Sequence, residues 1–123
     1  MNVVILNWRD IKNPQSGGAE ILTHEIAKYL VAKKNNVTIF SSIFPGSKKL
    51  EVLDGVKIIR DGKPDLRSGV NSVHYKAYTY YKNNKFGFID VLIDEVHGVP
   101  FFSPLYVKER KFALICEKAG KLW

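Results

Sequence analysis

The chain has 123 residues, of which 46% are hydrophobic, and this predicts one globular domain whose core needs no metal or disulfide. The single cysteine, Cys116, excludes an internal disulfide, and no run of ~18 apolar residues is present that could form a transmembrane helix. The formal net charge of +7 predicts an anionic partner, such as a phosphate-bearing ligand, a membrane surface or a nucleic acid, unless it serves solubility alone.

The first half of the chain predicts a strand, a helix and a second strand. Residues 3–6 form a short apolar run that is typical of a buried strand, and a loop follows over residues 7–18. Apolar residues then recur at helical spacing over residues 19–34, and a second strand is expected at 37–40. This order predicts a right-handed βαβ crossover. Because the chain begins with a strand-like run in place of a signal peptide, we expect a cytoplasmic protein, either free or at the inner face of the membrane.

The second half predicts one more helix and three more strands. The expected elements are a strand at 52–60 with a turn at Asp54-Gly55, a helix at 70–84, a strand at 89–93, a loop or short helical turn at 94–104 and a strand at 112–116. The whole order predicts an α/β domain, namely a Rossmann-like three-layer domain with a mainly parallel sheet. If the strand order is 3-2-1-4-5, the loops 7–18 and 94–104 meet where the order reverses, and ligands bind at such points.

Loop 7–18 ends in glycines at the start of the first helix. Gly17 and Gly18 allow a ligand to approach the backbone, and the helix N-terminus favours an anion such as a diphosphate. Arg9 and Asp10 follow the first strand directly, and Glu20 lies in the first helical turn. These five residues are the candidate substrate-binding residues of this loop. The alternative is an ordinary flexible turn in which Glu20 only complements the helix dipole.

Loop 94–104 contains a cluster that can transfer protons. Asp94, Glu95 and His97 are the candidate catalytic residues, and Gly98 is a further substrate-binding candidate that shapes the loop. The alternative is that Asp94 caps the following turn while His97 forms a local hydrogen bond. We expect no metal, because no other His or Cys has ligand spacing.

The segment from residue 66 to residue 89 contains no acidic residue but several Lys, Arg and Tyr residues. A basic, aromatic helix at 70–85 predicts peripheral contact with an anionic membrane surface. Stacking on single-stranded nucleic acid is a weaker alternative. The simplest interpretation places the tyrosines on the sheet and the lysines in solvent.

Two segments together form a pattern that is more specific than either loop alone. The first comprises Asn7-Trp8-Arg9-Asp10, Pro14-Gln15-Ser16-Gly17-Gly18-Ala19-Glu20 and Thr23-His24-Glu25. The second reads Asp94-Glu95-Val96-His97-Gly98-Val99-Pro100-Phe101-Phe102-Ser103-Pro104-Leu105-Tyr106. These residues resemble the opening domain of group 1 (family 4) glycosyltransferases, and the resemblance covers essentially the whole chain.

The resemblance implies one half of a GT-B fold, in which two Rossmann-like domains face a cleft. The N-terminal domain binds the acceptor, such as a sugar or a lipid-linked sugar, and the C-terminal domain binds the nucleotide-sugar donor. Transfer retains the anomeric configuration, usually without a metal, and we expect no cofactor. Gly17 and Gly18 would lie against the donor diphosphate or the acceptor, and His97 and its acidic neighbours near the transferred sugar. Residues 1–123 would form the acceptor-side domain alone, and we expect it to be inactive without a donor-binding domain.

Three other classes of protein compete with this interpretation. A stand-alone ligand-binding module of the flavodoxin or receiver type fits poorly, because a receiver needs paired acids directly after its first strand. A nucleic-acid-binding protein would use the basic helix and would bind with strong salt dependence. A dehydrogenase that binds NAD(P) is disfavoured because the first strand is not followed by a GxGxxG turn.

Overall fold

The computed structural model describes residues 1–96, 101 and 103–115. The strands are β1 (Asn2–Leu6), β2 (Asn36–Ser41), β3 (Leu50–Leu53), β4 (Val56–Arg60), β5 (Val91–Val96) and β6 (Arg110–Ile115). The helices are α1 (Gly18–Ala32) and α2 (Val73–Lys82), with short 3-10 helices η1 (Leu66–Asn71) and η2 (Ser103–Leu105). Within the described part of the chain, no helix has the length and apolar character needed to cross a bilayer.

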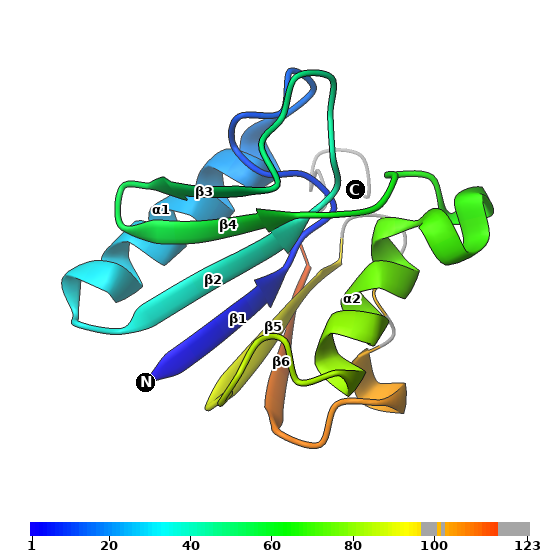
Figure 1. Ribbon diagram of the computed structural model, residues 1–123. Coiled ribbons are helices and arrows are strands. Elements are labelled where there is room, and N and C mark those ends of the chain that lie inside the picture. The colour runs from blue at the N-terminus through cyan, green and yellow to red at the C-terminus, as the bar shows by residue number, and fades with distance from the viewer. Residues whose placement is uncertain (97–100, 102, 116–123) are drawn as a thin grey trace, which may run out of the picture.

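The strands form one sheet in the order β3-β4-β2-β1-β5-β6 (Figure 1). Every pairing is parallel except that of β3 with β4. The predicted α/β class and mainly parallel sheet are therefore confirmed. The expected order 3-2-1-4-5 corresponds to β4-β2-β1-β5-β6, so the reversal of strand order does fall between β1 and β5.

The expectation of one strand over residues 52–60 missed a hairpin. Asp54 and Gly55 both have positive φ, 54° and 79°, and they form a turn that pairs β3 with β4. The missed strand β3 lies at the edge of the sheet, where Leu50 and Val52 are exposed, so it lacks the apolar signal of a buried strand.

The second helix is shorter than its apolar period predicts. Gly69, with φ 60° and ψ −120°, interrupts the helical path within η1, so α2 begins only at Val73. The side chain of Ser72 caps α2 by accepting a hydrogen bond from the backbone N–H of Tyr75 at 3.2 Å.

The two long helices pack on opposite faces of the sheet (Figure 1). One apolar cluster joins α1 to alternate strand residues, including Val3, Ile5, Val37, Ile39 and Ile58. The other joins α2 to the intervening residues, including Val4, Leu6, Phe40, Ile59 and Leu92. Because successive side chains of a strand point to opposite faces, an almost continuous apolar run can supply both clusters.

The fourth expected strand continues further than its apolar run predicts. Residues 89–93 were expected to form it, but β5 runs from Val91 to Val96. Asp94 and Glu95 therefore lie within a strand and not in the loop that follows it. This shift decides how the candidate catalytic residues are oriented.

Candidate functional site

The carboxyl ends of β1 and β5 lie side by side, as expected at a reversal of strand order. Leu6 at the end of β1 pairs with Asp94 in β5, and α1 begins at Gly18 close to the same edge. The structure therefore brings together the α1 N-terminus and the carboxyl ends of the two central strands. This is the candidate site.

Gly17 and Gly18 are not required by the fold. A Cβ added at either position would meet no atom of the described residues within 4 Å, and Gly17 has an extended backbone with φ −137°. Gly62 is different, because its φ is 84° and a Cβ there would lie 2.7 Å from Cα of Val73. The described residues thus leave room for a side chain at both positions of the α1 N-terminus. No described side chain caps this helix end, so its first N–H groups have no side-chain acceptor among the described residues.

Asp10 is buried and fully engaged in internal hydrogen bonds. Its carboxylate accepts from Nε of Arg60 at 2.7 Å and from the second guanidinium nitrogen at 3.0 Å. It also accepts from Oγ of Ser41 at 3.1 Å and from the backbone N–H of Lys12 at 2.9 Å. Asp10, predicted to bind substrate, therefore ties the loop after β1 to β2 and β4.

Arg60 extends this hydrogen-bonded cluster to β3, the edge strand of the sheet. Its remaining donors reach the carbonyl of Lys48 at 3.0 Å and Oε1 of Glu51 at 2.9 Å. Hydrogen bonds from Lys12 and then from Arg60 hold the pKa of Glu51 down at about 2. The buried guanidinium has a raised pKa, because the hydrogen bonds to Asp10 and Glu51 outweigh the opposing effect of burial.

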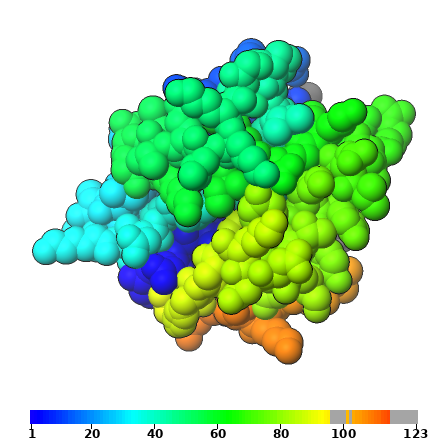
Figure 2. All heavy atoms as spheres, viewed as in Figure 1, coloured from blue at the N-terminus to red at the C-terminus, as the bar shows by residue number. Residues whose placement is uncertain are grey.

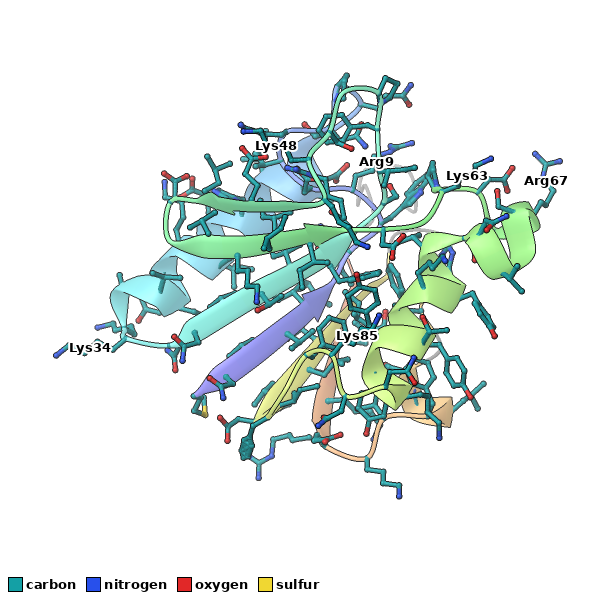
Figure 3. All side chains as sticks on the ribbon, viewed as in Figure 1. Arg9, Lys34, Lys48, Lys63, Arg67 and Lys85 are labelled. Atoms are coloured by element: carbon teal, nitrogen blue, oxygen red, sulfur yellow. The ribbon has the colours of Figure 1, made fainter. Side chains whose placement is uncertain are left out.

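Arg9 lies on the outside of the same loop, where Figure 3 labels it. Its guanidinium carbon is 3.9 Å from the centre of the Trp8 ring, and its nitrogens reach the carbonyl and Oε1 of Gln15 at 3.4 Å each. The Trp8 carbonyl accepts a hydrogen bond from Oγ of Ser42 at 2.7 Å. Arg9 is thus held by a cation–π contact but keeps a partly exposed charge near the site.

Asp94 and Glu95 point to opposite faces of the sheet because they are neighbours in a strand. Asp94 accepts hydrogen bonds from the backbone N–H groups of Phe101 and Ser103, each at 3.2 Å, and from Oγ of Ser103 at 2.8 Å. It therefore binds the backbone at the start of η2, a local structural role of the kind that the capping alternative gives it. The expected cluster of adjacent acids is split, and Glu95 alone faces α1.

Glu95 is 1% exposed and lies against the first turns of α1. Burial raises its pKa to about 7; the hydrogen bond with Thr23 opposes this, and the negative charge of Glu20 adds to it. The hydroxyl of Thr23 also lies 3.0 Å from the carbonyl of Ala19, which can only accept. A hydroxyl has one proton, so when Thr23 donates to Ala19, Glu95 must be protonated to bond to Thr23.

Glu20 and His24 complete this buried face of α1. Glu20 is 3% exposed, and its Oε2, like Oε1 of Glu95, has no hydrogen-bond partner in the described chain. Nε2 of His24 lies 2.9 Å from Oδ2 of Asp54, and this hydrogen bond lowers the pKa of Asp54. Glu20, Thr23 and His24 share one helix face because they are three and four residues apart. That spacing could have identified Thr23 and His24, which the site prediction omitted.

His97 and Gly98 lie outside the described residues, so their predicted roles have no geometry here. In the parts of the chain that the structure describes, no group of three or more His, Cys, Asp or Glu residues could hold a metal ion. The geometry thus unites Gly17, Gly18, Glu20 and Glu95, and it separates Asp10 and Asp94 from them.

A scan against protein-family models and a search of curated proteins found no match to this chain. The resemblance to glycosyltransferases therefore remains a prediction, which only the geometry of the site can support.

Proposed function

We propose that this chain is the N-terminal, acceptor-side domain of a retaining GT-B glycosyltransferase, a Rossmann-like domain with helices on both sides of its sheet. It would close against a donor-binding domain and take part in the transfer of a sugar from a nucleotide-sugar to an acceptor. The observation that carries the proposal is the open, uncapped N-terminus of α1, bare at Gly17 and Gly18, beside the ends of β1 and β5.

The glycine pair supports diphosphate binding for a steric reason. The described residues leave room where side chains at residues 17 and 18 would stand, and this room supports a ligand at that place. A phosphate oxygen in that space would accept hydrogen bonds from the first N–H groups of α1 and would be favoured by the helix dipole. Arg9, on the neighbouring loop, supplies a further positive charge.

Glu95 acts on this helix end as a positioning residue. It holds Thr23 in the second turn of α1, and burial keeps it protonated up to near-neutral pH. A protonated Glu95 carboxyl adds no negative charge beneath the helix N-terminus. This lowers the repulsion that an incoming diphosphate would meet. The role of His97 near the transferred sugar rests on the resemblance alone.

A sugar-transfer assay tests the proposal directly. The chain would be assayed alone and with a candidate donor-binding domain, using radiolabelled nucleotide sugars and sugar or lipid-linked acceptors. We expect transfer only in the mixture. Gly18→Val should lower that transfer about 100-fold, because the added side chain displaces the bound phosphate. Unchanged transfer by Gly18→Val, or tight donor binding by the chain alone, would contradict the proposed site.

A second candidate function, contact with an anionic membrane, is favoured by a separate observation. An apolar groove of about 560 Å³ lies between η1, α2 and η2. Its rim includes Val70 and Leu105, which are 63% and 82% exposed, and the neighbouring Arg67 projects into solvent (Figure 3). Apolar groups beside basic ones are typical of surfaces that bind lipid headgroups and acyl chains together.

Vesicle sedimentation tests this second candidate. We expect the chain to bind vesicles that contain phosphatidylserine and to be released in 1 M salt, where the Debye length falls to about 3 Å. Leu105→Ser should weaken binding, whereas Lys48→Ala, at a distance from the groove, should have little effect. Binding that is unchanged at high salt would contradict an electrostatic attraction.

A further inference from the structure

A second concave surface lies at the amino ends of the strands, at the opposite edge of the sheet from the candidate site. Helix α2 has 10 residues and α1 has 15, so their lengths are about 15 Å and about 22 Å. Figure 1 shows α2 over the β5 side of the sheet, and the front of the amino halves of β1, β2 and β4 is uncovered. Figure 2 shows a hollow there, with the N-terminal strand at its floor.

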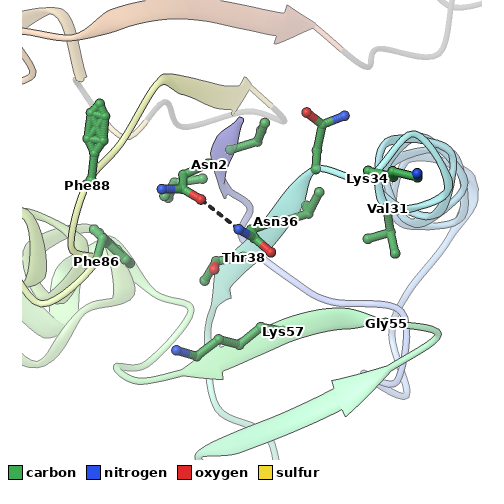
Figure 4. A pocket seen from close by; sticks show the side chains of 13 residues that line it. Asn2, Val31, Lys34, Asn36, Thr38, Gly55, Lys57, Phe86 and Phe88 are labelled. Atoms are coloured by element: carbon green, nitrogen blue, oxygen red, sulfur yellow. Dashed lines mark hydrogen bonds between the residues drawn. The ribbon is translucent and has the colours of Figure 1, made fainter.

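The floor of this amino-edge groove is a polar row that crosses three strands. Asn2 of β1 pairs with Asn36 of β2, and Thr38 of β2 pairs with Lys57 of β4. These residues lie on the same face as the α2 cluster, because each is an even number of residues, two or four, from a member of that cluster in the same strand. Nδ2 of Asn36 donates to Oδ1 of Asn2 at 2.9 Å (Figure 4). The row thus presents amide, hydroxyl and ammonium groups. Further along the same strands, the residues on this face are apolar and belong to the α2 cluster.

Two phenylalanines form one wall of the groove. Phe86 is fixed by an edge-to-face contact with Phe40, with ring centres 5.7 Å apart, whereas Phe88 is 65% exposed. Figure 4 shows both rings on one side, and the ammonium of Lys57 extends toward that side. An exposed Phe ring offers a flat apolar face on which another ring can stack.

The electrostatics of the groove favour an anion. Its lining contains Lys34 and Lys57 but no carboxylate, and the nearby carboxylate of Asp90 accepts a hydrogen bond from the backbone N–H of Asn2 at 2.6 Å. Lys57 forms no ion pair with any residue in the described ranges, and Lys85, next to Phe86, holds its ammonium 5.1 Å from the centre of the Tyr80 ring. The cavity, whose lining also includes Val31 and Gly55 on the α1 side of the sheet, has a volume of about 590 Å³, which is within the range of small-molecule sites.

We propose that the amino-edge groove binds a small molecule that joins a planar ring to a phosphate, as nucleoside monophosphates do. The phosphate contacts the ammonium of Lys57 and the hydroxyl of Thr38, and the ring stacks on Phe88. The amides of Asn2 and Asn36 bond to polar atoms between these two ends. This site is independent of the proposed glycosyltransferase cleft, which lies at the carboxyl ends of the strands.

An NMR titration of the chain with AMP tests the proposal. We expect saturable shifts of the backbone amides of Asn2, Asn36, Thr38 and Lys57, and binding about tenfold weaker for adenosine alone and for inorganic phosphate alone. Lys57→Ala removes a charge-assisted hydrogen bond and Phe88→Ala removes a stacking surface, so each should weaken AMP binding about tenfold. Both residues are exposed, so neither variant should change the melting temperature.

Lys48→Ala is the matched control, because it removes the same charge from an exposed lysine that Figure 3 places at the other end of the sheet. We expect it to leave AMP binding unchanged. Three results would overturn the proposal: no shifts in the groove, equal weakening by Lys57→Ala and Lys48→Ala, or equal binding of phosphate and AMP. The last two would indicate attraction to net charge alone. A failed transfer assay would not bear on any of them.

Discussion

Two buried polar clusters flank the end of β1, and they differ in how completely their hydrogen bonds are satisfied. In the first, Asp10 and Arg60 are each 1% exposed, and they form two hydrogen bonds with each other and four with neighbours. In the second, Glu20 and Glu95 are 3% and 1% exposed, but each has an oxygen without a partner in the described chain. A satisfied cluster fixes the structure, whereas an incompletely satisfied one can exchange a proton at near-neutral pH.

The largest effect should follow from breaking the satisfied cluster. Asp10→Asn leaves the buried guanidinium of Arg60 without its closest negative charge, and such a loss typically costs about 3–5 kcal/mol of unfolding free energy. Urea denaturation measures it. Arg67→Ala, which removes an ion pair of a residue that is 92% exposed at its side chain, should change stability by only about 0.5 kcal/mol or less. Similar values for the two variants would contradict the structural role of Asp10.

A smaller effect, dependent on pH, is expected from Glu95. Its pKa rises from 4.5 to about 7 on folding, so the folded state binds the proton more tightly. The corresponding stability is fully present below pH 4.5 and is lost as the pH rises through about 7, in total about 3 kcal/mol. Glu95→Gln cannot ionise, so it should match the wild type at pH 4 and exceed it in stability at pH 8. Parallel stability curves for the two proteins would show that Glu95 does not titrate in this range.

Two glycines allow a similar comparison, because the fold requires glycine at residue 62 but not at residue 18. Gly62→Ala places a Cβ 2.7 Å from the backbone of Val73 at a φ of 84°, so it should destabilise the domain by about 1–3 kcal/mol. Gly18→Ala meets no described atom within 4 Å and should change stability by only about 0.5 kcal/mol, and in the stabilising direction. Thermal unfolding of both variants is the measurement. A large loss with Gly18→Ala would mean that the fold requires this glycine, and it would weaken the case for a ligand there.

The sequence by itself determined the succession of strands and helices, because apolar periodicity and turn residues are local properties of the chain. It also located the two central loops, and Gly17 and Gly18 at the start of α1. Where each strand ended was decided by pairing: β5 extends through Asp94 and Glu95 because β6 hydrogen-bonds along its whole length, and the pleat then sends these two acids to opposite faces. The partnership of Asp10 with Arg60 joins residues 50 positions apart and follows only from the order of the strands. The sequence likewise does not predict the amino-edge groove, because the groove depends on how far α2 reaches across the sheet.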